Sequence, residues 1–245
     1  MKKNITLLLL ILPFLVKAVN YTSIANGNWN VSTNWNPHGI PGASDTATIN
    51  TSITFNTAES IFTIIINSSQ TLTVSGANTL TVKGNFTNNG TFTPATGTVT
   101  FNSTGAKTLG GSTQTTFYIL TSGNSGSLTL GNNITTTSDL DIYSGTFDVS
   151  ASNYSVTVGG DFLMNGTFTY QNGTVTMNGS SAPTLGGSNL FMNNLIINGA
   201  VTMINTCRVL NCTINSGYSL TQTSSAVFVV RGDLTNNGTY TAAFH

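Results

Sequence analysis

Charged side chains, cysteine and histidine are scarce in this sequence. Of its 245 residues, seven are Lys or Arg, seven are Asp or Glu and two are His, so charged residues make up 6% of the chain, against roughly a quarter in ordinary soluble domains. Seven cations spread over the whole length cannot form the basic patch that nucleic-acid binding requires. Two cysteines are too few for a disulfide-stabilised scaffold. The composition therefore argues against a nucleic-acid partner and a disulfide-rich fold.

Small polar residues dominate instead. The chain has 44 Thr, 31 Asn, 25 Ser and 25 Gly, which together make up about half of it. Hydrophobic residues account for 39% and alternate with the polar ones, which argues against charged or proline-rich disorder. Alternation rich in threonine is typical of extended β structure.

Residues 1–18 have the three-part order of a secretory signal peptide. Lys2 and Lys3 give a positive start, residues 5–16 form an apolar run that contains Pro13, and Ala18 suits the position before a cleavage site. The run is too short to span a bilayer, so we predict a secreted or cell-surface protein with no transmembrane segment after cleavage. Removal of the leader leaves seven acidic residues and four cations, a net charge near −3. These cations are Lys83, Lys107, Arg208 and Arg231.

A long internal repeat organises the rest of the chain. Residues 80–111 align without a gap to residues 156–187, with 19 identities in 32 positions, and a third copy at 228–241 breaks off early. Within each copy, apolar residues alternate with Thr, Ser or Asn between Asn-Gly turns, the pattern of short strands. A solenoid accepts the duplication of several turns, because each turn contacts only its neighbours. We therefore predict an all-β, single-stranded β-solenoid, specifically a right-handed parallel β-helix, over residues 61–245.

Residues 19–60 differ in composition from the repeats. They contain both tryptophans, Trp29 and Trp35. The end of a solenoid exposes apolar side chains and unpaired backbone groups, which a cap must cover. We interpret this region as an N-terminal cap with the two tryptophans buried in it; an aromatic platform that stacks on sugars is the alternative.

The order Trp29, Trp35, Pro41, Asp45, Ile49 resembles the start of secreted, Bacteroidetes-type β-helix proteins. The segment GNFTNNGTFTPATGTVTFNSTGAKTLGG resembles the repeats of their large, adhesin-like surface proteins. This resemblance implies a β-helix and a surface role without a defined activity. Members of this group are commonly longer and end in a sorting domain, so the break in the third copy predicts that the chain is a fragment or truncated product.

Catalytic β-helices need clustered acids, bases or metal ligands. Asp139 and Asp141 are two residues apart, on one side of a strand, and Asp148 follows one strand later. Three carboxylates could hold calcium or act as an acid–base pair, but they also fit a solvated surface patch. His38 lies in a loop of the cap region, where a structural role suits it. We predict no catalysis, no metal and no cofactor, with a polysaccharide-degrading β-helix as the enzyme alternative.

Two further motifs have simple structural interpretations. Arg231-Gly232-Asp233 spells an integrin-binding tripeptide, but it aligns with the corresponding Gly-Asn and Gly-Asp turns of the other copies. Cys207 and Cys212 could form a disulfide in an oxidising compartment. Because five residues of straight strand separate their Cα atoms by about 17 Å, that bond requires a turn near Asn211 or stacking of the two thiols inside the solenoid.

Repeated Thr-x-Thr triplets suggest another function. In each triplet the apolar central residue should point inward and both hydroxyls outward, so a stacked array would resemble ice-binding β-solenoids. Threonine is also simply a good strand former. The residues of this candidate array are Thr71, Thr73, Thr79, Thr81, Thr91, Thr93, Thr98, Thr100, Thr167, Thr169, Thr174 and Thr176.

The scarcity of reactive side chains favours a structural or adhesin-like surface module. Its polar faces suit contacts with carbohydrate or cell-surface components. Ice binding and polysaccharide binding or degradation are the alternatives. A terminal turn after Thr241 would leave an unpaired edge, so we also predict self-association through the C-terminal end.

Overall fold

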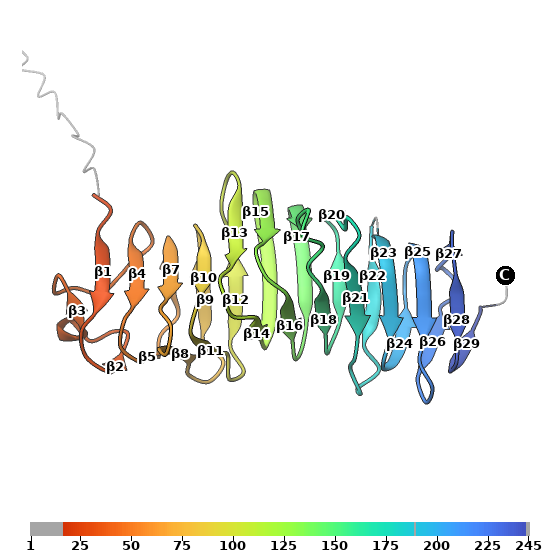
Figure 1. Cartoon of the computed structure of the whole chain (residues 1–245), viewed down its shortest axis with the longest axis horizontal. Coiled ribbons are helices and arrows are strands. Elements are labelled where there is room, and N and C mark those ends of the chain that lie inside the picture. The colour runs from red at the N-terminus through yellow and green to blue at the C-terminus, as the bar shows by residue number, and fades with distance from the viewer. Residues whose placement is uncertain (1–16, 189, 244–245) are drawn as a thin grey trace, which may run out of the picture.

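The structure is a computed structural model that describes residues 17–188 and 190–243. The chain is an elongated β-solenoid of about ten turns, with 54% of its residues in strands (Figure 1). Within the described residues, the one helical segment is the single 3-10 turn η1 (Ser32–Asn34), and no helix is long and apolar enough to cross a membrane. The prediction of an all-β solenoid is confirmed, whereas the predicted signal peptide lies almost entirely outside the described residues.

Each turn after the first contributes one strand segment to each of three faces, and the first turn contributes to faces 2 and 3. Four long strands, β15, β17, β23 and β25, continue around an edge and belong to two faces.

Face 1 is built from β6 (Glu59–Ile61), β9 (Thr79–Val82), β12 (Thr98–Phe101), the first parts of β15 (Ile119–Leu130) and β17 (Leu140–Asp148), β19 (Phe162–Met164), β22 (Thr184–Gly187), β24 (Ala200–Met203), β26 (Ser219–Gln222) and β29 (Thr239–Thr241). Face 2 is built from β1 (Asn20–Ser23), β4 (Thr46–Ile49), β7 (Thr63–Ile66), β10 (Phe86–Asn88), β13 (Lys107–Gly110), the second parts of β15 and β17, β20 (Thr167–Thr169), the first parts of β23 (Leu190–Ile197) and β25 (Cys207–Ile214), and β27 (Phe228–Val230). Face 3 is built from β2 (Gly27–Asn28), β5 (Ile53–Phe55), β8 (Thr71–Val74), β11 (Thr91–Thr93), β14 (Thr115–Phe117), β16 (Ile134–Thr136), β18 (Val156–Val158), β21 (Thr174–Met177), the second parts of β23 and β25, and β28 (Leu234–Asn236).

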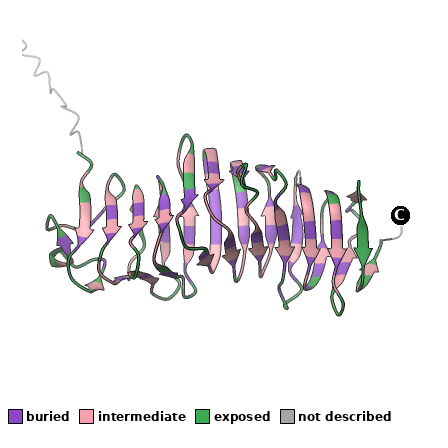
Figure 2. Cartoon of the chain, in the orientation of Figure 1, coloured by how far each residue is buried: buried purple, intermediate pink, exposed green. Residues whose placement is uncertain are grey.

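In-register parallel pairing keeps apolar residues inside and polar residues outside. On face 1, Leu80 lies beside Val99 and Val99 beside Leu120, all buried, while Thr81 and Thr100 alternate with them on the outer surface. Figure 2 shows this alternation as purple and pink bands along successive strands. Because side chains alternate with a period of two, one register preserved over many turns builds a continuous apolar core.

The N-terminal turn is closed by the two tryptophans. The rings of Trp29 and Trp35 meet edge to face with centroids 4.9 Å apart, and both side chains are fully buried. Trp35 Nε1 donates a hydrogen bond to the Trp29 carbonyl at 2.9 Å, and Trp29 packs on Phe55 of β5 with ring centroids 5.2 Å apart. These contacts support the cap interpretation, and burial leaves neither ring free to stack on a sugar.

Parallel stacking begins earlier in the chain than residue 61. β1 pairs with β4, and β4 pairs with β7, all in parallel, while β3 (Trp35–Asn36) pairs antiparallel with β1. The cap is therefore an antiparallel segment and loop placed against turns that already belong to the solenoid.

Successive repeat copies start on different faces. The first copy begins at β9 on face 1, the second at β18 on face 3 and the third at β27 on face 2. The repeat unit is therefore not a whole number of turns, and each copy is rotated by one face relative to the previous one. Residues that are equivalent in the repeat consequently lie on different edges of the solenoid.

The Leu-Gly-Gly that ends each complete copy is required by the close stacking of turns. Gly111 and Gly187 have φ angles of +123° and +129°, a region that favours glycine. A Cβ at Gly111 would meet the backbone of Asn88, and one at Gly187 would meet the backbone of Met164. The repeat preserves glycine here because the preceding turn occupies the space of a side chain.

Candidate functional site

The Thr-x-Thr motifs do not form one array. On face 3, β8 and β11 place Thr71 beside Thr91 and Thr73 beside Thr93. On face 1, β9 and β12 place together Thr79, Thr81, Thr98 and Thr100. The remaining motifs are separate, on β20 of face 2 and on β21 of face 3: Thr167, Thr169, Thr174 and Thr176. Because the repeat copies are rotated relative to one another, equivalent motifs point to different sides.

A longer threonine column runs along face 3. Its members are outward residues of strands β14 to β28 that pair directly from turn to turn, interrupted once by Ile196. They are Thr116, Thr135, Thr157, Thr176, Thr213 and Thr235. A search for Thr-x-Thr motifs does not find this face 3 column, because most of its strands carry only one outward threonine. The stacking can be recognised only when the length of each turn is known.

The three aspartates proposed as a cluster do not come together. Asp141 lies in the face 1 part of β17 beside Thr121, whereas Asp148 lies in the face 2 part beside Thr129. Asp148 Oδ1 accepts a hydrogen bond from the Ser150 amide at 2.8 Å, which stabilises a turn. The predicted grouping of Asp139, Asp141 and Asp148 is therefore wrong for Asp148, because the strand turns an edge between the last two.

Asp161, not Asp148, is the third carboxylate of the group formed with Asp139 and Asp141. Burial, and then the carboxylates of Asp139 and Asp161, raise the pKa of Asp141 above its ordinary value of 3.8, while Tyr143 lowers it through a hydrogen bond. A groove of about 300 Å³ on the edge between faces 3 and 1 is lined by Asp139 and Asp161. Within the part of the chain that the structure describes, no group of three or more His, Cys, Asp and Glu could hold a metal ion.

The tripeptide Arg231-Gly232-Asp233 forms the turn between β27 and β28. The Asp233 amide donates a hydrogen bond to Asn211 Oδ1 of the preceding turn at 3.1 Å. The Asp161 amide makes the equivalent bond to Asp139 Oδ1 at 2.9 Å, so the same turn recurs in two copies. The structural interpretation of the tripeptide is supported.

His38 is exposed in the cap loop between Trp35 and Gly39.

Both cysteines are buried free thiols in β25. Cys207 belongs to the face 2 part of the strand and Cys212 to the face 3 part. Burial raises the pKa of Cys212 to about 12; burial and the neighbouring Cys212 raise the pKa of Cys207. The disulfide considered from the sequence is absent from this structure, although the strand does turn between the two residues.

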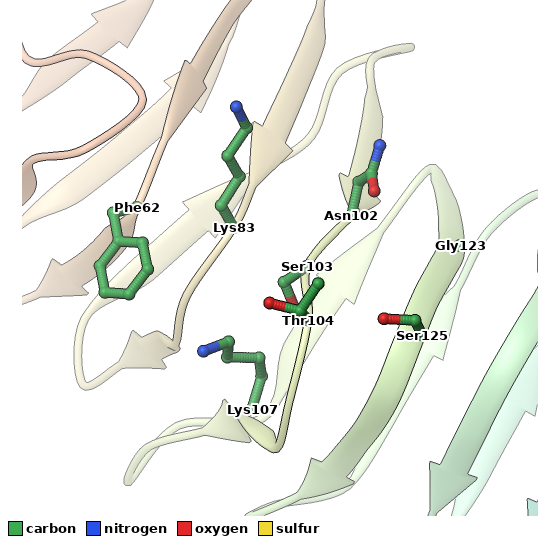
Figure 3. A pocket seen from close by; sticks show the side chains of 8 residues that line it. All are labelled: Phe62, Lys83, Asn102, Ser103, Thr104, Lys107, Gly123 and Ser125. Atoms are coloured by element: carbon green, nitrogen blue, oxygen red, sulfur yellow. The ribbon is translucent and has the colours of Figure 1, made fainter. Parts of the chain in front are cut away.

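A groove of about 480 Å³ follows the edge between faces 1 and 2 (Figure 3). We call it the lysine groove, because Lys83 and Lys107 line it and no acidic residue does. Its other lining residues are Phe62, Asn102, Ser103, Thr104, Gly123 and Ser125. Lys107 Nζ lies 5.3 Å from the centroid of the Phe62 ring, whose side chain is 42% exposed.

A smaller groove of about 140 Å³ follows the edge between faces 2 and 3. We call it the arginine groove, because Arg208 and Arg231 line it together with Tyr170 and Phe191. Arg208 Cζ lies 5.2 Å from the centroid of the Phe191 ring. The four cations that follow residue 17 thus all line one of two grooves, each with a cation over an aromatic ring.

Sequence reasoning missed both grooves because their residues are far apart in the chain. The contributions to the lysine groove come from the corners of four successive turns, from Phe62 to Ser125. The turn length of the solenoid was the missing signal, since it determines which corners stack. Comparison with protein-family models, curated proteins and solved structures finds no match to this chain.

Proposed function

We propose that this protein is a secreted or cell-surface structural module of the adhesin-like type, without catalytic activity, that contacts carbohydrate through its hydroxyl-rich face 3. The observation that carries the proposal is the face 3 threonine column. From Thr116 to Thr176 its hydroxyls recur once per turn, at the strand spacing of about 4.8 Å, and each can donate and accept a hydrogen bond. The resemblance to Bacteroidetes-type surface repeats points in the same direction.

A stacked β-solenoid suits this role because its binding groups are held in place before the ligand arrives. Thr135, Thr157 and Thr176 are paired through their backbones to both neighbouring turns. Little backbone freedom remains to be lost on binding, which lowers the entropic cost of contact with an extended surface. Uncharged hydroxyls also interact with neutral sugars without the desolvation penalty of a charge.

The test is co-sedimentation of the purified chain with two insoluble polysaccharides, cellulose and chitin. We expect binding by the wild type and its loss in the triple variant Thr135→Val, Thr157→Val, Thr176→Val, which removes three hydroxyls with little change in shape. The matched control changes the stacked face 1 residues Thr184, Thr202 and Thr221 to Val and should bind as the wild type does. Absence of binding by the wild type, or release of reducing sugar, would contradict the proposal.

Ice binding is a second candidate because four Thr-x-Thr motifs stack in register as two pairs. Thr79 and Thr81 lie beside Thr98 and Thr100 on face 1, and β8 and β11 repeat the arrangement on face 3. Thermal hysteresis and ice shaping by the purified chain, lost on changing Thr81 and Thr100 to Lys, would support it. Absence of both effects would eliminate it.

A further inference from the structure

We propose that the lysine groove binds an acidic polysaccharide, one that carries carboxylate or sulfate groups along its chain. The inference rests on the proposed function and adds the class of glycan that the module selects. It uses the edge between faces 1 and 2, a part of the surface that the threonine column does not include.

The first argument is the placement of charge. Lys83 and Lys107 come from neighbouring turns and are 24 positions apart in the sequence, yet both line one groove that contains no acidic residue. Asp139 and Asp161 line a groove on another edge, between faces 3 and 1. Lys83 and Lys107 therefore lie on a different edge from Asp139 and Asp161, so a polyanion meets attraction at the lysine groove and repulsion at the groove between faces 3 and 1.

The second argument is the chemistry between the two lysines. The hydroxyls of Ser103, Thr104 and Ser125 and the amide of Asn102 line the same groove (Figure 3). These groups donate and accept hydrogen bonds as sugar hydroxyls do, whereas two ammonium groups are few for a nucleic-acid backbone, whose binding strength depends on many phosphate contacts. The mixture of few cations and many neutral polar groups matches a sugar chain with intermittent charges.

The third argument is that the groove is already ordered. Asn124 is fully buried, and its Oδ1 accepts hydrogen bonds from the Ser103 amide at 2.8 Å and the Ser103 hydroxyl at 3.2 Å. The Ser125 amide donates to the Ser103 carbonyl at 3.0 Å. Lys107 lies over Phe62, a cation–π contact that holds the ammonium at the groove. The wall of the groove formed by Ser103 and Ser125 and the ammonium group of Lys107 are therefore held in place before a ligand binds.

The arginine groove repeats this arrangement on another edge. It holds Arg208 and Arg231, with Arg208 over the ring of Phe191 and Tyr170 alongside. Guanidinium groups bind carboxylate and sulfate oxygens through paired hydrogen bonds. We therefore expect it to bind the same class of glycan independently of the lysine groove.

The experiment compares three soluble polysaccharides as probes: polygalacturonate, which carries carboxylates, dextran sulfate, and uncharged dextran. Binding to the full chain is measured by biolayer interferometry. In a background with Arg208→Gln and Arg231→Gln, which removes the charges of the arginine groove, the further changes Lys83→Gln and Lys107→Gln should weaken binding of both acidic probes about tenfold, the loss expected when charge-assisted contacts are removed. The control Ser180→Asp, Ser216→Asp lowers the net charge equally at two exposed loop positions and should have a much smaller effect.

The variant Lys83→Arg, Lys107→Arg keeps both charges and should bind nearly as the wild type does. Wild-type binding of the acidic probes should also fall steeply as NaCl is raised from 0.05 to 0.5 M, because exposed charges are screened. The salt test uses only the wild-type chain, so its result does not depend on whether a variant folds. Equal binding of dextran and dextran sulfate, insensitivity to salt, or an equal loss in the Ser→Asp control would overturn the proposal.

Two outcomes separate this inference from the function on which it rests. Binding to cellulose and chitin uses face 3, so the Lys→Gln variant should retain it. If neutral polysaccharides bind and acidic ones show no preference, the lysine groove proposal fails and the proposed function stands. Equally tight binding of a thymidine oligonucleotide would show a general polyanion site and contradict the assignment to a glycan.

Discussion

Asn85 and Asp161 accept the same hydrogen bond from the next turn of the solenoid, on different edges. The Thr108 amide donates to Asn85 Oδ1 at 3.0 Å, and the Thr184 amide donates to Asp161 Oδ1 at 2.7 Å. Both acceptors occupy one position of the internal repeat. A short side chain with an oxygen therefore links consecutive turns at both of these corners.

This relationship predicts the effect of changing Asp161. We expect Asp161→Asn to unfold at nearly the same urea concentration as the wild type, since Asn85 makes the same bond with an amide oxygen. Asp161→Ala should lower the free energy of unfolding by about 1 kcal/mol, the usual contribution of one hydrogen bond. Equal stability of the Ala and Asn variants would show that the bond contributes nothing.

Trp35 should contribute strongly to stability. Its side chain is fully buried and its Nε1 donates to the Trp29 carbonyl. Trp35→Ala should therefore lower the free energy of unfolding by about 3–5 kcal/mol, and Trp35→Phe, which keeps the ring packing, by less. Guanidinium unfolding curves give both values, and an Ala variant as stable as the wild type would refute the cap interpretation.

The raised pKa of Asp141 predicts a pH dependence of stability. The folded state holds this proton more tightly than the unfolded chain does, so ionisation of Asp141 destabilises the fold as pH rises above 3.8 and through its folded pKa. Asp141→Asn should therefore raise the melting temperature at pH 7, with a difference that vanishes below pH 3.8. Asp148→Asn is the control and should give no such gain, because Asp148 accepts the Ser150 amide.

The thiols of Cys207 and Cys212 should be unreactive in the folded protein. Burial raises the pKa of Cys212 to about 12 and also raises that of Cys207, so almost no thiolate is present at pH 8. Iodoacetamide should label neither residue until guanidinium is added, and then both. Rapid labelling of the native chain would contradict the burial of the two thiols. Failure to label after denaturation without a reductant would reveal a disulfide.

Self-association through the C-terminal turn remains a prediction with a specific test. In the part of the chain that the structure describes, no further turn covers β27 to β29, and Leu234 is 47% exposed. Such an edge offers backbone groups and apolar surface to another chain. We expect concentration-dependent dimers in sedimentation velocity, reduced by Leu234→Glu but not by Ser216→Asp. A monomer at every concentration would exclude this interface.

Local patterns were sufficient for the strands and for the burial of the two tryptophans, but not for the extent of the cap, because β1 and β4 already stack in parallel. Alternation around Val99 and Val175 identified β12 and β21, and the two tryptophans were correctly expected to be buried, because both follow from the period of a strand and the size of a ring. The grouping of Asp139, Asp141 and Asp148 failed for a different reason. The sequence placed Asp148 one strand after Asp141, but it could not show that this segment of β17 lies around an edge, on face 2.

The sequence by itself determined that this protein is an all-β solenoid with a hydroxyl-rich exterior that carries few charges, because two-residue alternation, gapless duplication and composition are properties of the chain alone. Only the tertiary structure decided which residues share a surface. The length of each turn, not the length of the repeat, determines which corners stack on one another. Each repeat copy is therefore rotated by one face relative to the previous copy, and residues that are equivalent in the repeat lie on different edges. Turn length brings Lys83 and Lys107 of one repeat copy to the same groove, whereas the rotation carries Arg231, the repeat counterpart of Lys83, to the arginine groove on another edge.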